Sequence, residues 1–522
     1  MNIIFPDYGK EAKLIKGKTI LAYLQELDID INASCGGEGK CGQCLIEIEC
    51  APGSISDKTE AENELIHDDV HRLACQAKIL KTDRHVYIRV PSLHHLRQLH
   101  ILESGEYRAI PFEPFVRREG ERVSMDGGEY AGAIYGIALD IGTTTLAMHL
   151  VDLETGEVLS VTSKENPQIK YGNDVISRIE FTRTGGDILQ RGIRNVIRQM
   201  IIALSDPAKI YDVVIVGNPV MRDLFFGYSV ESLGKSPYEP QSTKSVSKTA
   251  SELGLKTNPR AWVYGPPLIG GFVGADALAV VLATELYKKE EICMAIDIGT
   301  NTEIVLGNKD RMIATSCAAG PAFEGAGISY GIGGVNGAIK DVRIDAAEVS
   351  YKTIGDTKPI GICGSGLIDA LAELLENKII DGNGKFSGTE KEFKIAEGIS
   401  VSERDIDQLN LAKTAVALGV NVLIERYGIK LEDITHLFLA GGFANFTNTE
   451  NAIRIGLLPA IARDRIKKVG NAALEGAREM LISRIKREEA EAAAMRIEHI
   501  KLEEEEGFME KFVSELYFQN YL

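Results

Sequence analysis

Two stretches of this 522-residue chain repeat one pattern: IYGIALDIGTTTLAMHLVDLETG at residues 134–156 and ICMAIDIGTNTEIVLGNKDRM at residues 292–312. In each, an apolar strand ends in an aspartate, a Gly-Thr turn follows, and a second apolar strand returns. The N–H groups and hydroxyls of such a turn can surround a phosphate, while Asp140 or Asp297 can hold Mg²⁺ through water. One such hairpin alone is an ordinary β-turn. Two copies predict a nucleotide that is held from both sides.

The residues predicted to bind the phosphates are those of the two turns: Gly142, Thr143, Thr144 and Thr145 in the first, and Gly299, Thr300, Asn301 and Thr302 in the second. A third element, HLFLAGGFANF at residues 436–446, is an apolar strand that breaks at Gly441 and Gly442. Adjacent glycines allow a backbone to lie flat against a nucleobase or ribose. No P-loop sequence occurs in the chain, which excludes that motif as the source of an ATP site.

In this chain order, the two hairpins and the glycine pair resemble the superfamily of actin, sugar kinases and heat-shock ATPases. The resemblance implies two ribonuclease-H-like halves that close on ATP. The stretch VGADALA, which contains Asp276, is similar to the first connecting segment of that superfamily, whose acidic residue orients water or metal. Asp140, Asp276 and Asp297 are therefore the expected catalytic residues, with ATP and Mg²⁺ as ligands.

The N-terminal region concentrates cysteine in the stretch CGGEGKCGQC at residues 35–44. Cys35, Cys41 and Cys44 lie on one loop, and Cys75 follows thirty residues later. Four thiolates suit either zinc or an iron–sulfur cluster, but zinc ligands generally form two short knuckles, whereas a 2Fe-2S cluster takes one wrapped loop and a distant cysteine. The glycines of the loop let the backbone curl around a cluster, so a 2Fe-2S cluster is predicted.

The cysteine spacing resembles the 2Fe-2S ferredoxin domain of β-grasp fold, over about residues 1–90. The predicted chain is thus a multidomain α/β and α+β protein. It has a ferredoxin-type domain at 1–90, a linker at 91–132, a first ribonuclease-H-like (middle) domain at 133–208, and a C-terminal ATPase domain at 209–522 that carries the second hairpin and the adenosine motif. Cys50, Cys293, Cys317 and Cys363 lie outside the cluster pattern and are expected to be packed thiols.

A ferredoxin domain joined to such an ATPase resembles the reductive activators of corrinoid proteins in anaerobic methyl-transfer systems. Further marks of the resemblance are NPQIKYGNDVISRI (166–179), VGNPVMRDLFFG (216–227), PPLIGGFVGADA (266–277), AAGPAFEGAGISYGIGG (318–334) and GICGSGLIDAL (361–371). The resemblance implies an ATP-hydrolysing iron–sulfur reductase. Its cluster would receive an electron from a low-potential donor and pass it to cobalt(II) of a partner corrinoid protein, which would regenerate cobalt(I).

Energetics explain the expected need for ATP. Plant-type 2Fe-2S clusters have reduction potentials near about −400 mV, and the cobalt(II)/(I) couple of a resting corrinoid generally lies lower. Electron transfer from the cluster to cobalt(II) would therefore be uphill, so binding energy must change the partner. ATP binding and hydrolysis could then reset the complex by shifting it between open and closed states of the cleft. Two alternatives are an electron donor to another low-potential enzyme, and a chaperone-like or kinase ATPase with a regulatory cluster.

Composition limits the remaining function classes. The formal net charge of −17 repels polyanions, so no nucleic-acid partner is expected. The N-terminus lacks a signal-peptide pattern, and the apolar run at 266–284 carries Asp276, so a cytoplasmic protein without a membrane partner is expected. From about Ile461 the chain is predicted to be helical, with a solvated charged face that is compatible with a homodimer.

Overall fold

The computed structural model describes residues 1–522 except 28, 30, 32–36, 38, 40–43, 67–69, 91–107, 121, 124–127, 130–131, 346–347, 443 and 519–522. Its residues divide into two compact units, Met1–Leu99 with Pro167–Thr184, and His100–Asn166 with Gly185–Leu522.

The first unit contains a five-stranded sheet in the order β2-β1-β5-β3-β4. Its strands are β1 (Asn2–Phe5), β2 (Lys10–Lys13), β3 (Leu45–Glu49), β4 (His71–Leu73) and β5 (Val86–Arg89). β1 and β5 are parallel, and the other neighbours are antiparallel. Helices α1 (Ile20–Glu26) and α2 (Glu60–Leu65) complete the domain. This mixed sheet is the predicted β-grasp ferredoxin fold.

Local sequence explains the helices of the first unit. The Thr19 hydroxyl accepts a hydrogen bond from Ala22 N at 3.2 Å and so begins α1, whose Ile20 and Leu24 are buried against the sheet. The unit also includes η3 (Pro167–Tyr171) and most of α3 (Val175–Gly185). Gln25 of α1 donates to the Lys170 carbonyl at 3.3 Å.

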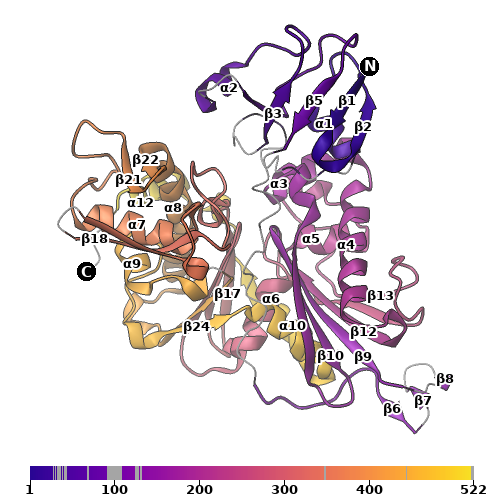
Figure 1. Cartoon of the computed structure of the whole chain (residues 1–522). Helices are drawn as coiled ribbons and strands as arrows, with labels where there is room; N and C mark the ends of the chain where they lie inside the picture. Colours follow the sequence, from indigo (N-terminus) through magenta and orange to yellow (C-terminus); the bar gives the residue numbers. More distant parts are fainter. Residues whose placement is uncertain are drawn as a thin grey trace. The chain divides into compact units, whose positions relative to one another are not determined.

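The second unit is built on two six-stranded sheets that repeat one strand order. The first sheet, β11-β10-β9-β12-β14-β13, contains β9 (Tyr135–Ile141), β10 (Thr145–Asp152), β11 (Val158–Glu165), β12 (Ile210–Gly217), β13 (Val246–Thr249) and β14 (Trp262–Gly265). The predicted division between residues 208 and 209 falls inside this sheet, because β12 follows it and pairs with β9. Figure 1 shows β9, β10 and β12 side by side, with α4 (Ile188–Leu204) and α5 (Pro219–Phe226) next to them.

The second sheet has the order β24-β23-β15-β16-β17-β25. Its strands are β15 (Cys293–Ile298), β16 (Thr302–Gly307), β17 (Met312–Cys317), β23 (His436–Ala440), β24 (Ile466–Gly470) and β25 (Ile497–His499). The run from β17 through β16, β15 and β23 to β24 matches the run from β11 to β14 in the first sheet, strand for strand. The chain therefore contains the two predicted ribonuclease-H-like halves.

A pair of helices lies between the two sheets. α10 (Ala472–Ile482) packs on β9 and β12, while α6 (Ala275–Thr284) contacts α10, β12, β15 and β16. One hydrophobic core consequently includes residues of both sheets, such as Ala138 of β9 and Ala295 of β15. The glycine-rich run before α6 thus leads into a short buried helix. None of the helices in the described parts of the chain is long and apolar enough to cross a membrane.

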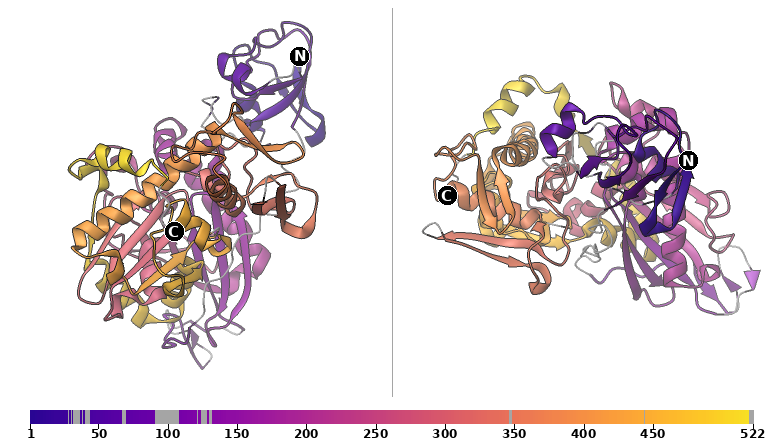
Figure 2. Two further views of the ribbon diagram at one scale, coloured as in Figure 1. Left: turned by 90° about the vertical axis from the view of Figure 1, so that its left-hand side faces the viewer. Right: turned by 45° about the horizontal axis from the view of Figure 1, so that its top comes forward.

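Further elements surround the second sheet. They are α7 (Gly364–Glu376), α8 (Glu403–Tyr427), α9 (Thr449–Arg454), α11 (Arg484–Ala494) and α12 (Phe508–Glu515), and the small sheets of β18 (Ala338–Asp345), β19 (Glu348–Thr353) and β20 (Gly361–Ile362) and of β21 (Glu392–Ala396) and β22 (Ile399–Ser402). α8 packs on β16 and β17, and α12 lies beside α8, as the yellow and orange helices of Figure 2 show.

Residues 108–132, within the predicted linker, contain β6 (Arg118–Glu119), β7 (Arg122–Val123) and β8 (Gly128–Glu129).

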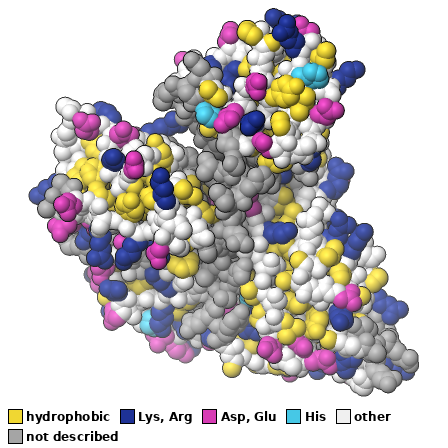
Figure 3. Space-filling model, in the orientation of Figure 1, with side chains coloured by type: hydrophobic (Ala, Val, Ile, Leu, Met, Phe, Trp, Pro, Cys, Tyr) yellow, Lys and Arg dark blue, Asp and Glu magenta, His cyan; other side chains and the backbone are white. Residues whose placement is uncertain are grey.

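The C-terminal region departs from its predicted form in two ways. Short strands β24 and β25 interrupt the expected helix, because their residues complete the second sheet. The charged side chains are also not all solvated: Arg478 and Glu475 pair at 2.6 Å, and Lys486 and Glu479 pair at 2.9 Å, all four buried. Burial of these charges is tolerated because each faces an opposite charge. On the face in Figure 3, other acidic and basic side chains are interspersed on the surface.

Candidate functional site

Two of the four predicted cluster cysteines lie together at one end of the ferredoxin sheet. Cys44 directly precedes β3 and Cys75 closely follows β4, and these two strands pair with Leu45 opposite Leu73. Ala74 N donates to the Cys44 carbonyl at 2.8 Å. Both thiols are buried, with exposed fractions of 1% and 6%. Cys35 and Cys41 lie outside the described residues.

Two described glycines of the predicted cluster loop, Gly37 and Gly39, lie close to the segment that carries Cys75. The Gln76 amide Nε2 donates to the Gly37 carbonyl at 3.0 Å and to Cys75 Sγ at 3.4 Å. Gly39 has a φ of +79°, a left-handed conformation that favours glycine, and it lies beside the Gln76 side chain. Two buried thiols, a Gly37 carbonyl that accepts a hydrogen bond from Gln76, and an N–H of Gln76 aimed at the Cys75 sulfur fit a 2Fe-2S cluster. The role of Gln76 was not predicted.

In the second unit, the two predicted phosphate turns face each other. The first joins β9 to β10, the second joins β15 to β16, and the hydroxyls of Thr144 and Thr300 lie 3.1 Å apart. Two asparagines outside the first turn fix it by hydrogen bonds: Asn166 Nδ2 donates to the Gly142 carbonyl at 2.8 Å, and Asn218 Nδ2 donates to Thr143 Oγ1 at 3.1 Å. The repeat in the sequence therefore produces one site between the two sheets.

The other predicted turn residues differ in their exposure. Thr145, Gly299 and Asn301 are half-buried, whereas Thr302 is fully buried inside β16. The structure thus brings Thr144 and Thr300 together and encloses the Thr302 hydroxyl in protein.

Acidic side chains gather beside the turns. Asp140 is the next-to-last residue of β9, Asp297 is the next-to-last residue of β15, and Asp276 lies in the first turn of α6. Burial, followed by the charges of Asp276 and Asp297, raises the pKa of Asp140 from 3.8 to about 8, against a 3.3 Å hydrogen bond from Asn471. Burial and the charge of Asp276 raise the pKa of Asp297 to about 7, and burial raises that of Asp276 to about 6.

A fourth carboxyl, Glu303, was missed by sequence reasoning. It lies in β16 directly opposite Asp297, and Ser316 Oγ donates to it at 3.4 Å. Burial, with the charges of Asp276 and Asp297, raises the pKa of Glu303 well above its usual value. The strand alternation of TNTEIV contained this signal, because residues opposite each other across a hairpin share a face of the sheet.

Clustered carboxyl groups with raised pKa values favour a nearby cation, which would relieve their mutual repulsion. Among the described residues, no group of three or more His, Cys, Asp or Glu could hold a metal ion directly. Carboxyl groups placed in this way could hold Mg²⁺ through its water ligands.

The predicted adenosine glycines follow β23 at the same end of the second sheet. Gly441 has a φ of +103°, and a Cβ there would lie 2.4 Å from the Ile298 carbonyl and 3.0 Å from Asp297 Oδ1. A Cβ at Gly442 would meet nothing within 4 Å. Gly441 is therefore pressed against β15, while Gly442 leaves open space beside it. Phe443 lies outside the described residues.

Comparisons with known proteins match three successive regions of the chain to families, and relatives match nearly its whole length. Residues 5–80 match the 2Fe-2S iron-sulfur cluster binding domain, residues 135–289 match the RACo middle region, and residues 291–521 match the C-terminal domain of RACo, the ASKHA domain. The corrinoid activation enzyme RamQ of Eubacterium limosum is 30% identical over 99% of both chains. A Co(II) methylated amine-specific corrinoid protein reductase of Methanosarcina barkeri is 30% identical over 73% of this chain and 77% of its own. A solved reductive activator for corrinoid, iron-sulfur protein superimposes with a TM-score of 0.72 at 28% identity, and covers 99% of this chain and 98% of its own.

Proposed function

Because this chain belongs to the family of reductive activators of corrinoid proteins, we propose that it reduces cobalt(II) of a partner corrinoid protein to cobalt(I) and that ATP binding and hydrolysis drive the transfer. The observation that supports ATP dependence most directly is the meeting of the two hairpin hydroxyls, Thr144 and Thr300, at 3.1 Å. They come from two different sheets, so a phosphate bound there would connect both halves of the ATPase.

Cys35, Cys41, Cys44 and Cys75 would hold the 2Fe-2S cluster, which supplies a one-electron carrier of low potential. The chain's own contribution includes the amide of Gln76, which donates to Cys75 Sγ at 3.4 Å. Such a hydrogen bond withdraws charge from a thiolate ligand and stabilises the reduced, more negative state. The residue thereby tunes the potential at which an upstream low-potential donor can deliver an electron.

Residues of both halves would contact the bound ATP. Thr144 and Thr300 would donate hydrogen bonds to phosphate oxygens, and Gly441 and Gly442 would admit the adenosine. The carboxyls of Asp140, Asp276 and Asp297 would hold Mg²⁺ through its water ligands and orient the water that attacks the terminal phosphate. Closing of the two sheets on the nucleotide would then change the surface presented to the corrinoid protein.

Composition and family also bear on the protein's location, partners and assembly. We propose a cytoplasmic protein that acts on a corrinoid protein, with neither nucleic acid nor membrane as partner, and a homodimer as one assembly that its C-terminal helices permit. The acidic composition supports the exclusion of nucleic acid as a partner, because a net charge of −17 disfavours polyanions.

The test is ATP hydrolysis by the purified, cluster-loaded protein under anaerobic conditions, with and without a cobalt(II) corrinoid protein. We expect the corrinoid protein to stimulate hydrolysis. Asp297→Ala should abolish hydrolysis and leave the cluster spectrum intact, whereas Cys41→Ser should damage the cluster and spare basal nucleotide binding. Hydrolysis that is indifferent to every corrinoid protein supplied, in the presence of an electron donor, would contradict the proposal.

A further inference from the structure

One carboxylate bridges the hydroxyl groups of the two phosphate turns. Glu324, at the end of the short helix η7 (Ala322–Glu324), accepts a hydrogen bond from Thr144 Oγ1 through its Oε2. Both of its oxygens also lie 3.1 Å from Thr300 Oγ1, which donates to them. Thr144 belongs to the first sheet's hairpin, and Thr300 and Glu324 belong to the second half, so this contact connects the two halves of the ATPase.

Proton counting limits what else these hydroxyls can bind. Each threonine hydroxyl has one proton to donate. Thr144 and Thr300 direct their protons toward the Glu324 carboxylate, or one toward the other. A phosphate that took these same protons would displace the carboxylate, because two anionic acceptors at one pair of donors also repel each other.

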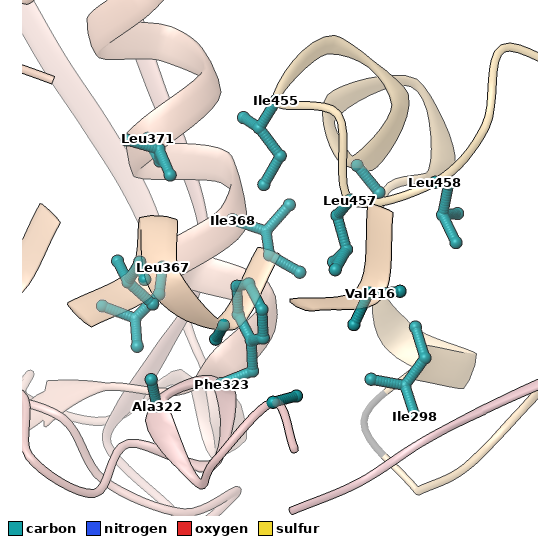
Figure 4. Packing of buried hydrophobic residues seen from close by; sticks show 14 of the residues in the cluster. Ile298, Ala322, Phe323, Leu367, Ile368, Leu371, Val416, Ile455, Leu457 and Leu458 are labelled. Carbon is teal, nitrogen blue, oxygen red and sulfur yellow. The ribbon is translucent and has the colours of Figure 1, made fainter. Parts of the chain in front are cut away.

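The loop that carries Glu324 is fixed to the core. Ala322 and Phe323 are buried among Ile298, Leu367 and other apolar residues, which Figure 4 shows. Gly320 N donates to the Thr300 carbonyl at 2.9 Å, which ties the loop to the second turn. Rotation of the Glu324 side chain alone can therefore release the two hydroxyls while the loop stays in place.

We propose that Glu324 is an internal competitor of the nucleotide's phosphate, and that carboxylate and phosphate alternate as the bridge between Thr144 and Thr300. The inference rests on the proposed function. It adds a regulation of nucleotide affinity at the same ATP site, by a residue outside the expected catalytic set. Bridging by Glu324 keeps the two halves connected, and phosphate replaces that connection with its own.

The test compares the affinity of the full, cluster-loaded chain for the ATP analogue AMPPNP by calorimetry in wild type, Glu324→Gln and Glu324→Ala. Glutamine keeps the shape of the side chain and removes the charge that competes with phosphate. We expect about tenfold tighter binding by Glu324→Gln, the size of one charge-assisted hydrogen bond. Glu397→Gln is the matched control, because Glu397 is an exposed glutamate of the same unit, and it should bind like wild type.

Thermal unfolding adds a readout that is independent of affinity. Without AMPPNP, Glu324→Ala should melt at a lower temperature than wild type, because the bridge is lost, and AMPPNP should raise its melting temperature more than it raises that of wild type. Weaker or unchanged AMPPNP binding by Glu324→Gln, while wild type binds, would overturn this inference and leave the proposed function standing. A wild-type chain that binds no AMPPNP would overturn both.

Discussion

Replacement of Asp140 by asparagine should make the protein more stable and less able to bind Mg²⁺-ATP. The pKa of Asp140 is raised to about 8 by burial and by the charges of Asp276 and Asp297. In the unfolded chain an aspartate titrates near 3.9. Folding therefore binds a proton between these two values, and stability falls as the pH rises from about 4 to about 8.

The magnitude follows from the shift. If Asp140 titrated alone, a pKa change from 3.8 to about 8 would cost about 5 kcal/mol of unfolding free energy at pH 8. Because Asp276 and Asp297 titrate with it, part of this cost is shared. We expect Asp140→Asn to gain about 2–4 kcal/mol at pH 8 and little at pH 4. If Asp140 orients metal-bound water as proposed, its replacement should weaken Mg²⁺-ATP binding about 10–100-fold.

Two assays on the same preparations check this pair of effects. Thermal unfolding of wild type and Asp140→Asn at pH 5 and pH 8 should show a stability gain that grows with pH. Calorimetric titration with Mg²⁺-AMPPNP should show the loss of affinity. The reasoning is wrong if the variant is no more stable than wild type at pH 8, or if it binds Mg²⁺-AMPPNP normally.

Three further predictions test other parts of the site. Gly441→Ala should weaken AMPPNP binding at least about tenfold in a calorimetric titration, since its Cβ would lie 2.4 Å from the Ile298 carbonyl, and normal affinity would remove Gly441 from the nucleotide site. Gln76→Leu should lower the reduction potential of the cluster by an amount on the order of tens of millivolts in an anaerobic redox titration, and an unchanged potential would refute the assigned N–H to sulfur bond. Thr144→Val, which keeps its volume but loses the hydroxyl, should weaken AMPPNP binding about tenfold, and full affinity would remove this turn from the phosphate site.

The sequence was informative wherever a short pattern determines both structure and chemistry. The strand–Asp–Gly–Thr–strand repeat predicted two equivalent hairpins, and these hairpins lie at the centres of two sheets with matching strand order. The glycine pair after β23 likewise lies next to Asp297, because parallel strands β15 and β23 end at the same edge of the sheet.

Residues that act through distant contacts were not predictable in the same way. Glu324 reaches the turns only because its loop packs into the core, and Asn471 reaches Asp140 from the start of α10. The burial of Arg478 and Lys486 had the same origin. Charged helices in the sequence look solvated, but α10, which carries Arg478, packs against β9, β12 and α6, and α11, which carries Lys486, packs against α10 and α6. Strand β25 was missed because its three residues are extended by pairing with β17, which no local pattern records.

The central claim, that ATP binding by the paired hairpins drives electron transfer to a corrinoid, is tested most directly by the absorbance of cobalt(I). The full chain with its cluster, an electron donor and a cobalt(II) corrinoid protein is mixed under anaerobic conditions, with and without Mg²⁺-ATP. The account predicts that cobalt(I) accumulates only with ATP and only while Asp297 and the cluster cysteines are intact. Equal formation of cobalt(I) without ATP, or undiminished formation by Asp297→Ala, would contradict it.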